Sequence, residues 1–338
     1  MQKTRKDEYI RIALEETVEY TEKTNGFERY ELEYLAFPDI DFDKLDTKVM
    51  FAGKELKIPF MITALTGGTE KGEKINKNLA KACERLGIAM GLGSQRIVFD
   101  HPETLRSFYV RHEAPHVFLF GNLGIHHLKE FGPEKCKKVV SDIEADGLAI
   151  YLNPIHEVSQ EKGNPEYSGL KNILEEFCNE VPFPVIIKET GNGLSEKTAI
   201  KLKDIKISAI DIAGAGGTSC VIMEYYLAKC SSRKKILKPF LNQGIPAAES
   251  LLAVRKVFPH IPLIASGGIR SGLDCAKAIA LGADLVGMAL PLLKPALISS
   301  EHVEEKLIEI IEQFKIAMFT AGVKNIEELR KIPLQKRG

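Results

Sequence analysis

Short apolar runs alternate with longer amphipathic segments from residue 59 onward. The apolar runs cover residues 60–63, 88–91, 117–120, 148–152, 185–188, 209–213, 263–265 and 285–288. Runs of this length, bounded by Gly, Pro and polar residues, are typical of buried strands. Segments with apolar positions spaced for one helix face lie between them, at 74–86, 133–145, 170–179, 196–203, 247–257 and 271–281. The pattern therefore predicts strand–helix units repeated along the chain.

Eight such units predict a (β/α)₈ TIM barrel of the α/β class, because parallel strands joined by helices close into a ring at that number. An open, doubly wound sheet is the alternative, but such sheets rarely carry eight evenly spaced units. A last helix over residues 302–320 would complete the outer ring. The long interval between the sixth and seventh strands holds residues 229–244, which we expect to form a loop over the active face.

The first part of the chain is polar and mixed, and it precedes the strand–helix repeat. Residues 1–58 are predicted to form an extension in front of the barrel, and residues 59–338 the barrel itself. Within the extension, apolar spacing favours a helix over 11–23, and 34–58 is expected to be a hairpin or loop. The extension is polar and mixed, so the sequence does not predict a second domain there.

The segment 263–289, LIASGGIRSGLDCAKAIALGADLVGMA, predicts a phosphate site. Gly267 and Gly268 follow a strand and precede a helix, so backbone amides and the helix N-terminus favour an anion there. Arg270 adds a charged fork suited to phosphate. In many barrels a phosphate lies after the seventh and eighth strands, which is where this segment falls. An ordinary strand-to-helix connection is the alternative.

Composition excludes several other classes of protein. The 338 residues are 44% hydrophobic, which is ample for a large core, and 46 Lys and Arg balance 46 Asp and Glu. Without a basic cluster, nucleic-acid binding is not expected. No apolar run reaches transmembrane length, and the charged start of the chain does not resemble a secretory signal. The six cysteines form no C-x-x-C pair. They suggest reduced thiols and a cytoplasmic location.

Glycine-rich, polar sequences follow nearly every predicted strand, at 63–68, 91–96, 121–124, 153–157, 188–193 and 214–219. These strand ends carry the chemistry of a barrel, so together they predict a large, flat ligand that bears a phosphate. Lys188 ends an apolar strand, where it is either a snorkelling lysine or a cation placed against a flavin ring. Ser94 and Asn122 are expected to bind the same ring, and Thr218 is expected to join the phosphate site.

Several motifs resemble the type 2 isopentenyl diphosphate isomerases. They are RKDE at 5–8, TGG at 66–68, GSQR at 93–96, NP-x-x-E at 153–157, KETGNG at 188–193, AGAGGTS at 213–219, SGGIR at 266–270 and MFTAG at 318–322. The resemblance implies an FMN-dependent barrel that interconverts isopentenyl and dimethylallyl diphosphate. It also implies reduced flavin, Mg²⁺, NAD(P)H as the initial reductant, and a homo-tetramer or homo-octamer.

By position, the resemblance assigns roles to residues along the whole chain. The expected flavin contacts are Thr63, Thr66, Gly67, Ser94, Asn122, Lys188, Thr218, Gly267, Gly268, Arg270 and Ala289. The expected substrate contacts are Arg5, Lys6, Arg96, Tyr151, Asn153 and His156. Glu157 is expected to bind Mg²⁺, and His156 and Lys188 to serve catalysis. Without the resemblance, Arg5 and Lys6 would be interpreted as a solvated tail and Glu157 as a surface carboxylate.

The sequence departs from the family pattern at Tyr9, Tyr151, His156, Cys220 and Asn242–Gln243, all expected on the substrate side. The flavin side keeps the pattern. Two other functions therefore stay open. One is an FMN oxidoreductase similar to the 2-hydroxy-acid oxidases, which need a histidine base at the flavin face. The other is a divergent protein that acts on, or only binds, another isoprenoid phosphate.

Overall fold

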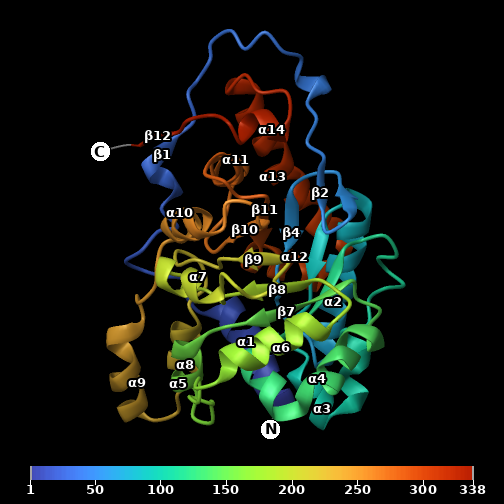
Figure 1. The fold of residues 1–338 in the computed structure, drawn as a ribbon, viewed down its shortest axis with the longest axis vertical. Coiled ribbons are helices and arrows are strands. Elements are labelled where there is room, and N and C mark those ends of the chain that lie inside the picture. The colour runs from blue at the N-terminus through green and yellow to red at the C-terminus, as the bar shows by residue number, and fades with distance from the viewer. Residues whose placement is uncertain (1, 337–338) are drawn as a thin grey trace.

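A computed structural model describes residues 2–336 and contains a closed barrel of eight parallel strands (Figure 1). The strands are β4 (Phe60–Ile62), β5 (Ala89–Gly91), β6 (Leu119–Gly124), β7 (Gly147–Tyr151), β8 (Val185–Lys188), β9 (Ala209–Asp211), β10 (Leu263–Ser266) and β11 (Leu285–Met288). Each strand pairs with the next, and β11 pairs with β4 to close the ring. The predicted (β/α)₈ fold is confirmed.

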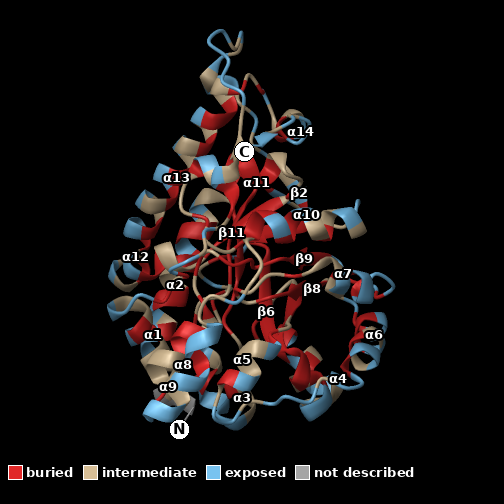
Figure 2. Ribbon diagram, turned by 90° about the vertical axis from the view of Figure 1, so that its left-hand side faces the viewer, coloured by how far each residue is buried: buried red, intermediate tan, exposed pale blue. Residues whose placement is uncertain are grey.

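Helices surround the barrel at the places where the apolar spacing predicts them. The outer helices are α2 (Glu70–Leu86), α4 (Ile125–Asp142), α6 (Leu170–Glu180), α7 (Glu196–Leu202), α10 (Ala247–Val257), α11 (Gly272–Ala280) and α13 (Ser300–Thr320). Shorter helices follow some strands: α3 (Arg96–Asp100), α5 (Pro154–Ser159), α8 (Cys220–Leu227) and α12 (Leu293–Ile298). Another short helix, α14 (Ile326–Leu329), follows α13. The buried residues gather in the strands at the centre (Figure 2).

The amino-terminal end of the barrel is closed by a hairpin from the extension. Its strands are β2 (Val49–Phe51) and β3 (Lys54–Leu56). Phe51 packs edge to face on Phe118, with ring centroids 5.3 Å apart. Phe51 and Leu56 belong to the same buried cluster as the inward-facing residues of the strands. Since this end is filled by apolar side chains, a ligand has room only at the opposite end.

The predicted helix over 11–23 is wrong in position. Helix α1 spans Gln2–Glu15, and the following residues are extended. There the Tyr20 amide donates to Gly217 O at 3.0 Å, and the Ser219 amide donates to Val18 O at 2.8 Å. The β-branched residues of this segment favour extended backbone, and pairing with a barrel loop outweighs the helical spacing that the apolar positions suggest.

Two other expectations need correction. Residues 229–244 are not a simple loop, because α9 (Ser231–Leu237) and a 3₁₀ turn (Lys238–Phe240) occupy much of them. Helix α4 begins at Ile125, well before the predicted start at 133. Gly132 has a non-helical backbone, with φ 75° and ψ 165°, and divides α4 into two arms. The predicted helix is the second arm, which starts at Pro133 because proline is tolerated at the first position of a helix.

Candidate active site

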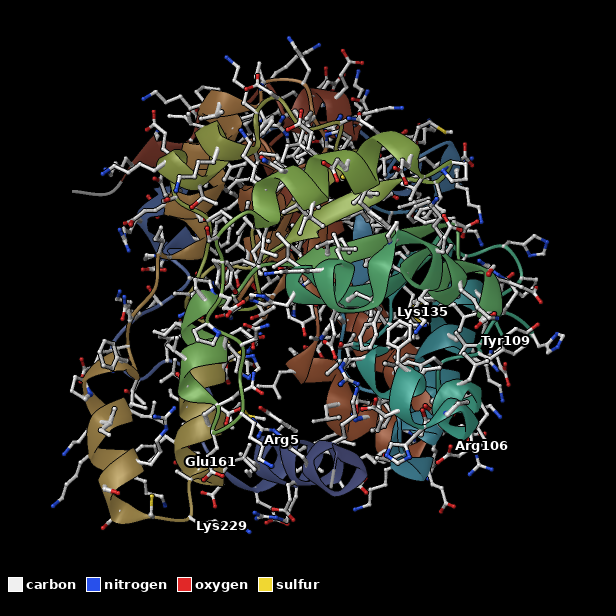
Figure 3. All side chains as sticks on the ribbon, turned by 60° about the horizontal axis from the view of Figure 1, so that its bottom comes forward. Arg5, Arg106, Tyr109, Lys135, Glu161 and Lys229 are labelled. Carbon is white, nitrogen blue, oxygen red and sulfur yellow. The ribbon has the colours of Figure 1, made fainter. Side chains whose placement is uncertain are left out.

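A cavity of about 660 Å³ opens at the carboxyl ends of the barrel strands, and α1 forms part of its wall. Residues at the ends of all eight strands line it, from Thr63 after β4 to Met288 in β11. Figure 3 shows α1 lying across this end of the barrel, with Arg5 on the side toward α5. The extension and the strand ends therefore build one site together.

Every residue predicted for the site lines this cavity except Gly67 and Asn153. Gly67 is packed so tightly that a Cβ there would lie 2.1 Å from the ring of Phe108. Asn153 is buried and caps α5, because its side chain accepts a hydrogen bond from the His156 amide at 2.8 Å. Asn153 thus acts on the site indirectly by fixing the helix that carries His156 and Glu157.

Two polar atoms at the barrel mouth are buried without a hydrogen-bond partner among the described residues: Ser94 Oγ and Asn122 Oδ1. Native proteins rarely leave such atoms unpaired, since a missing hydrogen bond costs free energy. Both atoms belong to side chains that line the cavity. A heteroaromatic ring such as flavin, with donors and acceptors along its edge, fits these groups.

The glycines of the SGGIR segment allow two loops to pack against each other. Gly267 and Gly268 have φ values of 102° and 74°, in the region that favours glycine. A Cβ at Gly267 would lie 1.9 Å from Gly214 O, and one at Gly268 would lie 2.4 Å from Gly216 O. The glycines therefore bring the AGAGGTS loop beside the backbone of the SGGIR segment, and the two loops form a cradle in the cavity wall.

Arg270 lines the cradle and contacts the extension. Its guanidinium pairs with the carboxylate of Glu19, and its Nη1 donates to Ile269 O at 2.7 Å. Asn25 adds a second contact from the extension, donating from Nδ2 to Gly268 O at 2.7 Å. Side chains of the extension thus hold the SGGIR segment in place, and Arg270 both pairs with the Glu19 carboxylate and lines the cavity.

Lys188 lies at the centre of a buried charged group. Its Nζ donates to Glu189 O at 2.5 Å, and in the barrel it is in register with Asp211 of β9. Burial raises the pKa of Asp211, while the charge of Lys188 opposes that rise. Lys188 is 6% exposed and lines the cavity. It is therefore a fixed cation rather than a snorkelling surface lysine.

The carboxylate of Glu189 holds the loop after β8. Its Oε2 accepts hydrogen bonds from the amides of Thr190, Gly191 and Asn192 at 2.6, 2.8 and 2.5 Å. Burial raises the pKa of Glu189 to about 7, although these amides and Lys188 lower it in part. Since Thr190 and Gly191 line the cavity, Glu189 shapes the site without contacting it.

Glu224, which the sequence does not single out, is the hub of the opposite end of the cavity. Its Oε1 accepts from Arg5 Nη2 at 2.5 Å and from the hydroxyl of Tyr9, and it lies 3.1 Å from His156 Nε2. These partners come from α1 and α5, while Glu224 comes from α8. Burial opposes the charge of Glu224, but His156, Arg5 and Tyr9 outweigh burial and lower its pKa.

The remaining cations lie near this hub. Lys6 donates from Nζ to Ser94 O at 2.7 Å, and burial lowers the pKa of Lys6 to about 8. Arg96 pairs with Asp100 at 2.6 Å and Glu130 at 3.3 Å. Together with Arg5, these side chains line the cavity at the end formed by α1. An anion of high charge is the ligand that such a group would bind.

Glu157 lines the same end, and its Oε2 accepts from the Asn164 amide at 2.9 Å. Among residues 2–336 no group of three His, Cys, Asp or Glu side chains is placed to hold a metal ion. A hard cation at Glu157 would therefore need most of its oxygen ligands from a substrate and from water, which suits Mg²⁺.

The substituted positions fall into two groups. Tyr9, Tyr151, His156 and Cys220 line the cavity. Gln243 lies outside that lining, and its backbone oxygen accepts from Tyr20 Oη at 3.0 Å and from Asn192 Nδ2 at 2.6 Å.

Helix α8 shows why Glu224 is easily overlooked. Glu224 is the one charged residue in the apolar stretch CVIMEYYL. None of the motifs that predict site residues includes it. A lone charge in such a stretch is the signal that finds it, because a buried carboxylate needs partners.

Comparison with known proteins identifies the class of enzyme to which the chain is similar. The sequence profile of the FMN-dependent dehydrogenase family matches residues 152–336. In fold, the chain is similar to lactate oxidase of Pediococcus acidilactici, with a TM-score of 0.69 at 16% identity, over 98% of this chain and 94% of that chain. It is also similar to mandelate oxidase, with a TM-score of 0.68 at 16% identity, over 99% of this chain and 98% of that chain. The profile match and the closed barrel define the class as an FMN-dependent (β/α)₈ barrel.

Closer relatives identify the family within this class. The chain is 45% identical to isopentenyl-diphosphate delta-isomerase of Pyrococcus furiosus, over 98% of this chain and 86% of that protein. It is 40% identical to the Nostoc sp. protein of the same name, over 97% and 94%. The Rickettsia typhi protein of that name is 42% identical, over 97% and 96%. The chain belongs to the type 2 isopentenyl-diphosphate delta-isomerase family.

The raised pKa of Glu189 predicts a stability that depends on pH. The folded protein keeps a proton on Glu189 up to about pH 7, whereas the unfolded chain releases it near pH 4.5. The contribution of Glu189 to the free energy of unfolding is therefore fully present below pH 4.5 and is lost as the pH rises through 7. Glu189→Gln keeps an oxygen acceptor for the three amides but cannot ionise.

Between pH 5 and pH 8, the wild-type protein should lose up to about 3 kcal/mol of unfolding free energy relative to Glu189→Gln. Denaturant unfolding of both proteins at the two pH values measures this difference. Parallel pH responses would show that Glu189 is ionised in the folded protein throughout.

The cradle predicts that Arg270→Ala weakens FMN binding. A lost charge-assisted hydrogen bond to phosphate costs about 1.5–3 kcal/mol, although partial exposure places the effect toward the lower value. Titration of FMN-free protein, followed by quenching of flavin fluorescence, measures the affinity. Arg233→Ala, which removes an arginine outside this cavity, is the control. Equal FMN affinity in wild type and Arg270→Ala would remove Arg270 from the phosphate site.

Proposed function

We propose that this protein is an FMN-dependent isopentenyl-diphosphate delta-isomerase. It interconverts isopentenyl diphosphate and dimethylallyl diphosphate in isoprenoid biosynthesis. The observation that supports this most is the division of one cavity into two ends. A glycine cradle and unpaired Ser94 and Asn122 atoms suit FMN, while Arg5, Lys6 and Arg96 line the end built by α1.

The cationic end suits a diphosphate. Arg5 and Lys6 belong to α1, and Arg96 begins α3, so the three cations approach from two separate elements. A diphosphate offers oxygen atoms for all three and offsets their charge. It would also favour the protonated form of Lys6, whose pKa burial lowers to about 8. Tyr151 of β7 lines the cavity beside these groups and gives shape to the pocket for the short hydrocarbon.

Mg²⁺ belongs to the same end in this proposal. Glu157 supplies one carboxylate, and the diphosphate and water complete the oxygen ligands. Asn153 caps α5, so it fixes the helix on which Glu157 and His156 lie. Because Glu130, the other lining carboxylate at this end, pairs with Arg96, Glu157 is the carboxylate proposed for the metal, and metal and substrate would bind as a unit.

The flavin-facing residues are those of the barrel. Thr63, Thr66, Ser94, Asn122 and Ala289 would contact FMN along the strand ends, with Thr218, Gly267, Gly268 and Arg270 at its phosphate. Lys188 would place its charge at the electron-rich edge of the ring. Reduced FMN, formed initially with NAD(P)H, supplies acid–base chemistry and an electron-rich surface beside the alkene.

His156 is the side chain proposed to share proton movement with the flavin. Its Nε2 lies 3.1 Å from both Glu224 Oε1 and the Tyr9 hydroxyl, so the ring has a fixed orientation at the cavity wall. Tyr9 and Arg5, which bind the same carboxylate oxygen, hold α1 against α5 and α8 while the substrate occupies the cavity.

An FMN oxidoreductase of the 2-hydroxy-acid oxidase type is the second candidate, and the fold favours it as much as the first. Its chemistry needs a histidine free to remove a proton at the flavin face. Here His156 is held by Glu224 and Tyr9 at the end of the cavity that carries the diphosphate cations. A protein that only binds an isoprenoid phosphate is the third candidate, and the substituted pocket residues are the reason to consider it.

The proposal extends to the setting of the enzyme. We expect it to act in the cytoplasm as a homo-tetramer or homo-octamer. Among the described residues, no helix combines the length and apolar character needed to cross a membrane.

Anaerobic turnover tests the proposed function. The protein with photoreduced FMN, Mg²⁺ and isopentenyl diphosphate should form dimethylallyl diphosphate, followed by NMR, over many turnovers without net flavin oxidation. Reduction of oxidised FMN by 2-hydroxy acids, without isomer formation from isopentenyl diphosphate, would favour the oxidoreductase. Tight binding of isopentenyl diphosphate without either reaction would leave a binding protein.

A further inference from the structure

His126 has no role in the chemistry described above, yet it faces the cavity. It follows β6 in the first arm of α4, is 6% exposed, and lines the cavity. Both of its ring nitrogens are buried, and neither has a hydrogen-bond partner among the described residues. A neutral imidazole offers one donor and one acceptor. A buried side chain with both left unpaired indicates that a ligand supplies the partners.

The neighbouring histidine shows what a structural histidine does at this place. His127 accepts a hydrogen bond at Nδ1 from the Gly124 amide at 2.9 Å, so it satisfies the start of the helix. His126 makes no such bond. Its ring is held instead by an edge-to-face contact with Tyr167, with centroids 4.5 Å apart. This contact orients the ring and satisfies neither nitrogen.

The surroundings place His126 at the diphosphate end. Glu157, the proposed metal ligand, exerts the largest charge effect on His126. Glu130 lies one helical turn further along α4, on the same face, and pairs with Arg96 at 3.3 Å. Burial lowers the pKa of His126, which favours the neutral ring. The ring therefore keeps one N–H donor and one acceptor.

We propose that His126 binds the metal–diphosphate unit of the substrate, donating one ring N–H to a phosphate oxygen and accepting a hydrogen bond from a metal-bound water. This inference rests on the proposed function. Phosphate oxygens are acceptors, so an ionised diphosphate alone satisfies only the donor nitrogen. Mg²⁺ keeps several waters when it binds phosphates, and those waters are donors. The hydrated metal–diphosphate unit thus satisfies both nitrogens at once.

Calorimetric titration of the FMN-loaded protein with inorganic pyrophosphate and Mg²⁺ tests the proposal. His126→Phe keeps a ring against Tyr167 but removes both polar atoms, and it should weaken binding roughly tenfold or more. His126→Gln retains a donor and an acceptor and should recover part of the affinity. His112→Phe is the matched control, because His112 packs edge to face on Tyr109 outside the cavity.

Two further measurements separate binding from a structural role. Thermal unfolding without ligand should give His126→Phe a midpoint equal to or above that of wild type, since unpaired polar atoms are removed. Pyrophosphate without Mg²⁺ should give a smaller difference between wild type and His126→Phe, because the metal-bound water is missing.

Equal pyrophosphate affinity in wild type and His126→Phe would overturn the proposal, as would a wild-type protein that does not bind pyrophosphate with Mg²⁺. A lowered midpoint with unchanged affinity would assign His126 a structural role. A difference that does not depend on Mg²⁺ would contradict the water contact. The protein could instead bind pyrophosphate in a manner that depends on His126 and yet fail to convert isopentenyl diphosphate. That result would contradict the proposed isomerase function and support the role of His126.

Discussion

The ion pair of Arg5 with Glu224 is the interaction on which the substrate end depends. Glu224 is 4% exposed, and a buried carboxylate without partners is strongly destabilising. Its partners come from α1 and α5, so the site assembles only when both helices pack against α8. Because the buried Glu224 carboxylate needs its partners on α1, the free-energy cost of leaving it unpaired favours the position of α1 that brings Arg5 and Tyr9 to it. The extension is for this reason part of the active site rather than an appendage to the barrel.

The flavin end depends on a different constraint, which is close backbone packing. Loops after β9 and β10 approach so closely that Gly217, Gly267 and Gly268 have no room for a side chain. This packing places the two loops side by side in the cavity wall, where we propose that the FMN phosphate binds. Lys188 and Asp211 are fixed by strand register in the barrel itself. The two ends therefore depend mainly on different interactions, one on backbone geometry and the other on a buried carboxylate, and Lys6 joins them by donating to Ser94 O.

Local patterns in the sequence predict much of this arrangement. The eight apolar runs predict the strands because parallel barrel strands are buried on both faces. Most predicted site residues line the cavity because strand ends of a barrel meet at one mouth. Glu224 was missed because its role arises from Arg5 and His156, which are distant in sequence. The extended backbone at Val18–Tyr20 was missed because its pairing partner is a loop about two hundred residues later.

Glu224→Gln tests most directly whether the substrate end and the flavin end depend on different interactions. The variant keeps the shape of the side chain but removes the charge that anchors Arg5 and His156. FMN affinity, measured by fluorescence titration, should stay within about twofold of wild type, while kcat for isopentenyl diphosphate should fall roughly tenfold or more. A parallel loss of FMN affinity would contradict the account, because it would show that the Glu224 cluster also supports the flavin end.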